Sequence, residues 1–160
     1  MHIPVEDQLV AFLPNLRRFA ISLCRDRELA DDLVQSACER ALANAGSFLP
    51  DTRFDAWMFL ILRNLWIDDA RRKQTRGIQE DVDAKVDLVG ATGVEVESRL
   101  ELKSVAEAID LLPEDQREVL LLVCVEGLSY KEAAEVAGAP IGTVMSRLAR
   151  ARLALARMME

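Results

Sequence analysis

Hydrophobic residues recur at intervals of three and four along most of this chain. In residues 28–44, for example, Leu29, Leu33, Ala37 and Ala41 follow one another four residues apart. Positions three and four apart lie on one face of an α-helix, so this spacing predicts amphipathic helices. No stretch shows an equally strong alternation of apolar and polar residues, which would predict strands. The pattern therefore predicts an all-α fold.

Residues that commonly begin or end helices divide this pattern into segments. Pro14 predicts the start of the first helix, which continues to Cys24, and Gly46 follows the second helix. Thr52 and Ser98 each precede an acidic residue by three positions, which is the spacing of a capping box. The segments predict helices over residues 14–24, 28–44, 54–73, 98–111, 113–125, 130–137 and 140–158.

The middle of the chain differs in composition from both halves. Residues 74–97 contain three glycines, no aromatic residue and many carboxylates, so they are poorly suited to a packed core. This change predicts two small helical domains, residues 1–75 and residues 98–160, joined by a flexible acidic linker over residues 76–97.

The last thirty residues contain the most informative pattern. Ser129 and Glu132 form a second capping-box spacing, Gly138 predicts the end of that helix, and Pro140 suits the first position of the next. A short helix, a glycine turn and a second helix are typical of a helix-turn-helix.

The second helix of this motif has two contrasting sides. One side is apolar and is expected to be buried; it carries Ile141, Val144, Leu148, Ala151 and Leu155. The other side is polar and basic; it carries Thr143, Ser146, Arg147 and Arg150, with Arg152 and Arg157 nearby. No acidic residue occurs between Pro140 and Met159. The pattern predicts a DNA-reading helix, and the alternative is an ordinary helical hairpin with a basic outer face.

The overall charge qualifies this prediction. The chain has a formal net charge of −7, whereas DNA-binding proteins usually carry a basic surplus. Since non-specific affinity for duplex DNA comes mainly from neutralised phosphates, the free chain should bind DNA weakly unless a larger partner delivers it.

Composition argues against several other classes of protein. No apolar run approaches the ~20 residues that cross a bilayer, and the N-terminus lacks the pattern of a secretory signal. The three cysteines, Cys24, Cys38 and Cys124, are widely spaced and the single histidine is His2, which is too few ligands for a zinc site. Buried, reduced thiols are expected, with a redox role as the alternative.

Catalytic motifs are missing from the sequence as well. It has no phosphate-binding glycine loop and no nucleophile motif with a histidine base nearby. We therefore expect a protein that is not an enzyme, with no catalytic residue, no metal and no cofactor.

Four segments follow one another in a distinctive order. They are residues 31–35 (DDLVQ), residues 54–72 (beginning FDAWMF), residues 112–120 (LPEDQREVL) and residues 127–148 (containing GLSYKEAA and PIGTVMSRL). In this order they resemble the extracytoplasmic-function (ECF) sigma factors of the sigma-seventy family, which are bacterial transcription initiation factors. The resemblance covers nearly the whole chain.

This resemblance implies a role for each half of the chain. The N-terminal domain would bind the clamp helices of core RNA polymerase through Asp31, Asp32, Leu33 and Gln35. It would also recognise the minus-ten promoter element as single-stranded DNA, with help from the loop 47–52. The residues implied in that recognition are Asn64, Asp68, Arg71, Arg72 and Lys73.

The C-terminal domain would read the minus-thirty-five element as duplex DNA. The residues implied are Thr143, Met145, Ser146, Arg147 and Arg150, and arginine and serine side chains suit phosphates or base edges. Two positions depart from commoner forms of the family, since Met145 stands where a basic residue is frequent and Ala149 where a larger side chain can occur.

The resemblance also implies partners and a location. We expect core RNA polymerase, promoter DNA and an anti-sigma factor as partners, a cytoplasmic location, no membrane insertion and a part in stress responses. Two alternatives stay open. One is a sigma-like decoy that binds an anti-sigma factor without reading DNA, and the other is a conventional helix-turn-helix transcription regulator.

Overall fold

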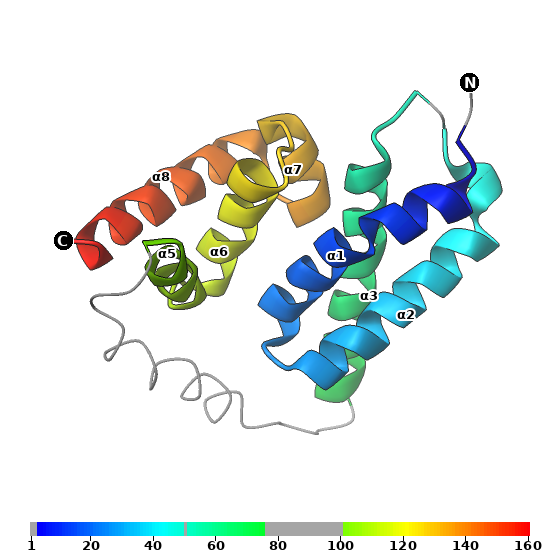
Figure 1. Ribbon diagram of the computed structural model, residues 1–160, viewed down its shortest axis with the longest axis horizontal. Helices are drawn as coiled ribbons and strands as arrows, with labels where there is room; N and C mark the ends of the chain where they lie inside the picture. Colours follow the sequence, from blue (N-terminus) through cyan, green and yellow to red (C-terminus); the bar gives the residue numbers. More distant parts are fainter. Residues whose placement is uncertain (1–2, 50, 76–100) are drawn as a thin grey trace.

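The computed structural model of the chain describes residues 3–49, 51–75 and 101–160, and all regular structure in these ranges is helical (Figure 1). The predicted all-α class is confirmed. The predicted linker 76–97 and the predicted cap at Ser98 lie outside the described residues. The helices are α1 (Val5–Cys24), α2 (Arg27–Ala43), α3 (Phe54–Thr75), α5 (Glu101–Asp110), α6 (Glu114–Leu120), α7 (Tyr130–Ala137) and α8 (Ile141–Met158).

The N-terminal half is a bundle of α1, α2 and α3, each of which packs against the other two. Aromatic rings fill its centre, because Phe12 and Phe19 both contact Phe59 edge-on with ring centroids 5.0 Å apart. Leu16, Phe19 and Phe59 are essentially inaccessible to water. Burying side chains of this size is the main source of stability in such a bundle.

The first helix begins earlier than the sequence predicts. It starts at Val5 and contains Pro14, which was expected to open it. A proline inside a helix removes the hydrogen bond to the carbonyl four residues earlier, here that of Val10. Both Pro14 and Val10 are exposed, so water can bind that carbonyl and the helix continues.

The start of α3 also differs from its prediction. The Thr52 hydroxyl donates to the Leu49 carbonyl at 2.7 Å and does not cap α3, which begins two residues later at Phe54. Phe48 holds this loop in place, since its ring lies 4.9 Å from Trp57 and 5.6 Å from Phe54 between centroids. Aromatic packing thus supplies the order that a capping box was expected to give.

The C-terminal half is built on α8, which packs against α5, α6 and α7. Between α6 and α7 the chain makes a π-helical turn, η3 (Leu121–Val125). The Glu126 amide donates to the Leu121 carbonyl at 2.8 Å, five residues back, and the Leu128 amide donates to the Leu122 carbonyl at 2.9 Å. The predicted helix 113–125 therefore changes its pitch near its end, and Glu126 follows directly.

The two halves contact each other through charged groups with little access to water. Arg63 of α3 donates to the Glu118 carboxylate of α6 at 2.6 Å, and the Glu118 side chain is only 5% exposed. Burial raises the pKa of Glu118, while Arg63 opposes that shift. Next to Glu118, the buried Arg117 donates to the Ser22 carbonyl of α1 at 3.1 Å and to the Leu112 carbonyl at 2.9 Å.

A second group of contacts lies at the other end of the same interface. The Glu126 side chain is 2% exposed and accepts from Asn15 at 2.8 Å and from Arg18 at 2.7 and 2.9 Å. Arg53, just before α3, pairs with Glu132 of α7 at 3.0 Å. In this second group the positive charge comes from the N-terminal half and the negative charge from the C-terminal half.

Removing the Glu118 carboxylate should destabilise the protein, because Arg63 would be left without its partner in a poorly hydrated site. We expect Glu118→Ala to lower the free energy of unfolding by about 3 kcal/mol, measured by urea denaturation. The matched control is Glu114→Ala, which removes an exposed glutamate from the same helix and should change the free energy of unfolding by less than about 0.5 kcal/mol. Equal stability of the two variants would contradict this role for Glu118.

Candidate nucleic-acid interface

The helix-turn-helix forms as the sequence predicts. The Ser129 hydroxyl accepts from the Glu132 amide at 3.1 Å, and the Glu132 carboxylate accepts from the Ser129 amide at 2.8 Å. Gly138 ends α7 with φ +65°, a conformation that glycine adopts without strain. Pro140 is the N-cap of α8, one position before the place predicted for it.

The buried side of α8 is shorter than predicted. Val144, Leu148 and Ala151 are buried as expected, and Leu155 is partly buried. Ile141, which was expected in the same stripe, is 49% exposed. It is the first residue of α8 and precedes the part of the helix that packs against the rest of the domain. The burial of Ile141 was therefore predicted wrongly.

The opposite side of α8 presents its candidate DNA-reading residues unequally. Met145, Ser146 and Arg150 are exposed, while Thr143 is partly buried. The Arg147 side chain is 26% exposed and lies 3.5 Å from the Asp115 carboxylate of α6. Of the two arginines predicted to read DNA, Arg150 is therefore the one whose guanidinium faces water.

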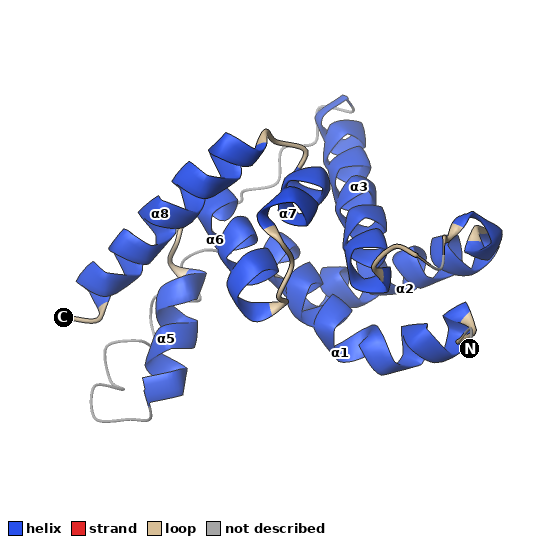
Figure 2. Cartoon of the chain, turned by 90° about the horizontal axis from the view of Figure 1, so that it is seen from above, coloured by secondary structure: helices blue, strands red, loops and turns tan. Residues whose placement is uncertain are grey.

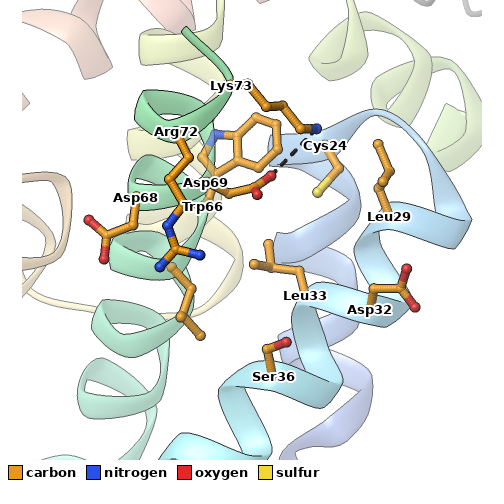
Figure 3. A pocket seen from close by; sticks show the side chains of 11 residues that line it. Cys24, Leu29, Asp32, Leu33, Ser36, Trp66, Asp68, Asp69, Arg72 and Lys73 are labelled. Atoms are coloured by element: carbon orange, nitrogen blue, oxygen red, sulfur yellow. Dashed lines mark ion pairs between the residues drawn. The ribbon is translucent and has the colours of Figure 1, made fainter. Parts of the chain in front are cut away.

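The candidate minus-ten residues of α3 lie along neighbouring parts of the helix surface. Asn64, Asp68, Arg71 and Arg72 are spaced by three and four residues, so they lie along one side. The Asn64 amide is exposed and makes no hydrogen bond within the described residues. Asp68, Arg72 and Lys73 also line the pocket toward α2 that Figure 3 shows, and the Lys73 amine lies 3.5 Å from the Asp69 carboxylate.

A pocket of about 350 Å³ lies between α2 and the C-terminal part of α3 (Figure 3). Asp32 and Leu33, two of the candidate polymerase-binding residues, line it from α2. Asp31 pairs with Arg17 of α1 at 2.8 Å and Gln35 donates to Glu39 at 3.2 Å. The four candidates thus share one helix but not one environment.

Arg147, one of the candidate reading residues of α8, lies close to α3. Trp66 and Ile67 of α3 line a hollow of about 350 Å³ together with Asp115, Glu118 and Arg147. Figure 2 shows α7 between α3 and α8, and α7 packs against both. Sequence reasoning gave no role to Arg63, Glu118 or Glu126. The motif LPEDQREVL contains Glu118, but its spacing alone does not reveal a partner on α3.

The described residues also bear on metal sites, membrane spans and thiols. They contain no cluster of histidine, cysteine and carboxylate side chains that could hold a metal ion, and no helix long and apolar enough to cross a membrane. Cys24 is buried and Cys38 partly buried, but Cys124 is exposed, so the expectation of three buried thiols was wrong for Cys124.

Comparison with known proteins identifies the family of both halves. Residues 9–76 match sigma-70 region 2, and residues 102–155 match sigma-70 region 4. The chain is 41% identical over 155 residues to the ECF RNA polymerase sigma factor EcfG of Rhodopseudomonas palustris (strain TIE-1), covering 97% of this chain and 84% of that protein. It is 35% identical to the ECF RNA polymerase sigma factor SigM of Mycobacterium tuberculosis, covering 90% and 71%.

Two solved structures are similar over almost the whole chain. The sigma factor RpoE of Bartonella quintana, solved with the anti-sigma factor NepR, superposes with a TM-score of 0.72 at 32% identity, covering 96% of this chain and 95% of that one. CnrH, solved with the cytosolic domain of CnrY, superposes with a TM-score of 0.65 at 28% identity, covering 97% and 86%.

The capping box of α7 should make stability depend on pH. Burial tends to raise the pKa of Glu132, but hydrogen bonds from Ser129 and the charge of Arg53 outweigh it and hold that pKa below its usual range. The stabilisation is therefore present at neutral pH and is lost as pH falls from the ordinary glutamate range through the lowered pKa. We expect Glu132→Ala to lower the melting temperature at pH 7 and by less at pH 4, measured by circular dichroism.

Glu135→Ala is the matched control, because Glu135 is an exposed glutamate on the same helix. Its melting temperature should follow that of the wild-type protein at both pH values. If Glu132→Ala lowers the melting temperature by the same amount at pH 7 and at pH 4, the lost interaction is not ionic.

Proposed function

The chain belongs to the ECF sigma factors of the sigma-70 family, and we propose that its two halves divide promoter recognition between them. Residues 1–75 act as the domain that binds core RNA polymerase and the minus-ten element, and residues 98–160 act as the domain that reads the minus-thirty-five element. Residues 76–97 connect the two. The observation that carries this division is the helix-turn-helix, whose second helix has an exposed face free of acidic residues.

Charge supports upstream reading by α8. The chain as a whole has 27 acidic and 20 basic residues, whereas α8 has arginines and no acidic residue. The charge of this helix is therefore opposite in sign to the net charge of the chain. The exposed Arg150 suits guanine edges or phosphates, and the exposed Ser146 lies one turn before it on the same side. Thr143, Met145 and Arg147 complete the proposed reading surface.

The exposed side of α3 supports recognition of single-stranded DNA. An extruded base needs hydrogen-bond partners for its edge, and the Asn64 amide can both donate and accept. Asp68 lies one turn further along the same side, where Arg71 and Arg72 can hold phosphates. Lys73 contributes positive charge at the edge of this surface.

We assign core RNA polymerase to α2. Asp31, Asp32 and Gln35 are exposed and Leu33 is half-buried beside them, which suits contact with a basic partner surface. Polymerase would deliver the chain to DNA, and this delivery accounts for a net charge of −7 in a DNA-reading protein. The polymerase carries out the chemistry in the cytoplasm, and the chain itself is proposed to have no catalytic activity.

An anti-sigma factor is the proposed inhibitor. RpoE of Bartonella quintana was solved with such a protein. In this chain an apolar groove of about 710 Å³ runs between α1 and the C-terminal half, with Leu13 and Val125 at its rim 38% and 44% exposed. A groove of this kind fits the apolar face of a partner's helix.

Run-off transcription with purified core polymerase on genomic fragments tests the proposal as a whole. Specific starts that require this chain would support it. A chain that binds an anti-sigma factor but yields no starts would be the decoy, and a chain that binds DNA without polymerase would be a conventional regulator.

Arg150 provides the test of upstream reading. We expect Arg150→Ala to reduce specific initiation roughly tenfold, because one bidentate base contact contributes ~1–3 kcal/mol of discrimination. The matched control is Arg157→Ala, an exposed arginine near the end of the same helix. Both variants should co-purify with core polymerase at wild-type levels. Unchanged initiation by Arg150→Ala would remove this residue from the reading surface.

Asn64 provides the test of downstream reading. Asn64→Ala should strongly lower initiation on a fully paired promoter, and most of that loss should be recovered on a promoter mismatched across the minus-ten element. Unpairing a base costs a few kcal/mol, and the mismatch removes this cost. Gln74→Ala, exposed near the end of α3, is the control. Equal losses on both templates with a lower melting temperature would assign Asn64 a structural role.

A further inference from the structure

The outward side of α8 carries apolar residues as well as arginines. Ile141 is 49% exposed and Met145 is 50% exposed, and they are followed on the same side by the exposed Ala149. These three residues are spaced by four, which places them along one line on the first half of the helix. None of them packs into the core of the domain, so all three side chains are available to contact a partner.

The polar groups beside this line have limited capacity to read bases. The Ser146 hydroxyl already donates to the Thr143 carbonyl within the helix at 3.1 Å. Arg147 is paired with Asp115. Among the described residues, Arg150 is therefore the cation of the reading face that makes no ion pair, and the rest of the exposed face is mainly apolar.

The charge around the line identifies the kind of partner. Residues 140–159 contain four arginines and no carboxylate, within an acidic chain. A face of this kind fits a polyanion whose surface also offers an apolar group. In the major groove of DNA the C5-methyl of thymine is the apolar group among hydrogen-bonding donors and acceptors.

We propose that Met145 and Ala149, with Ile141 at the edge, read thymine methyl groups in the upstream promoter element. This inference rests on the proposed function, because it assigns the sequence preference of the same helix. Residues four apart are separated by about 6 Å along the helix axis, close to two base-pair steps of 3.4 Å. The thymines read by Met145 and Ala149 should therefore lie about two base pairs apart.

Uracil provides a direct test, since it pairs like thymine but lacks the methyl group. On a promoter defined by run-off transcription, the upstream element is synthesised either with thymine or with uracil, and initiation by the holoenzyme is measured on both. We expect uracil to reduce initiation about fourfold for each methyl contacted, which is the equivalent of ~0.8 kcal/mol. Uracil placed between the two promoter elements should have no effect.

Variants connect the effect to the proposed residues. Met145→Gln keeps the length of the side chain but removes its apolar character, and it should lose most of the preference for thymine over uracil. Leu153→Gln is the control, because Leu153 is 54% exposed two turns further along α8 and should keep that preference. Arg150→Ala should lower initiation on both templates and leave the ratio between them unchanged.

The outcomes separate this inference from the function on which it rests. Equal initiation on thymine and uracil templates by the wild-type holoenzyme would overturn methyl reading and leave the sigma-factor function intact. Failure to initiate on any thymine template would instead count against the proposed function. If Met145→Gln weakens binding of an anti-sigma factor but leaves the thymine preference unchanged, the apolar line is a protein-binding surface and the inference is wrong.

Discussion

The ion pair between Arg63 and Glu118 is the interaction on which the arrangement of the described helices depends. It joins α3 to α6 at a point where the Glu118 carboxylate has lost nearly all contact with water. A buried charge without a partner is strongly unfavourable, so each of these residues requires the other. The neighbouring Arg117 satisfies carbonyl groups on both sides of the interface and extends the same contact to α1.

This interface also explains how an acidic chain can contain a helix-turn-helix. Several carboxylates of the C-terminal half face arginines of the N-terminal half, as Glu126 faces Arg18 and Glu132 faces Arg53. These carboxylates are therefore directed away from the exposed face of α8. Asp115, which pairs with Arg147, is the exception among the described ion pairs, so the net charge of the molecule and the local charge of its reading helix are set largely by different surfaces.

The sequence predicted the parts of the fold that depend on local patterns. The capping box of Ser129 and Glu132, the glycine stop at Gly138 and the extent of α2 follow from residues close together in the chain, and the structure has all of them. The errors arose where solvent or tertiary contacts decide. Pro14 is tolerated inside α1 because its side of the helix is exposed, and Thr52 bonds to Leu49 because aromatic packing sets the loop.

The chemical types of the candidate site residues could be predicted from the sequence, but the ion pairs between helices that involve them could not. The types of residue on α3 and α8 could be recognised from motif and charge, and the i,i+4 spacing of Asp69 and Lys73 indicates their ion pair. The partner of Arg147 could not be recognised in this way. Asp115 is 32 residues from Arg147 in the chain, and their approach requires α6 and α8 to pack together. Ion pairs of this kind decide which cations remain available for DNA, and a linear pattern contains no information about them.

The hollow shared by Trp66, Ile67 and Arg147 has a geometric consequence. Elements centred ten and thirty-five base pairs before a transcription start are separated by about 85 Å of B-form duplex, at 3.4 Å per base pair. The helices α3 and α8 both border this small hollow, so in this arrangement they cannot reach both elements at once. On the proposed function, the conformation in which α3 and α8 border this hollow is therefore a resting one that competes with promoter binding. Stronger contacts between the halves then leave a smaller fraction of molecules ready to bind the promoter. The apparent affinity for the promoter is the intrinsic affinity multiplied by that fraction.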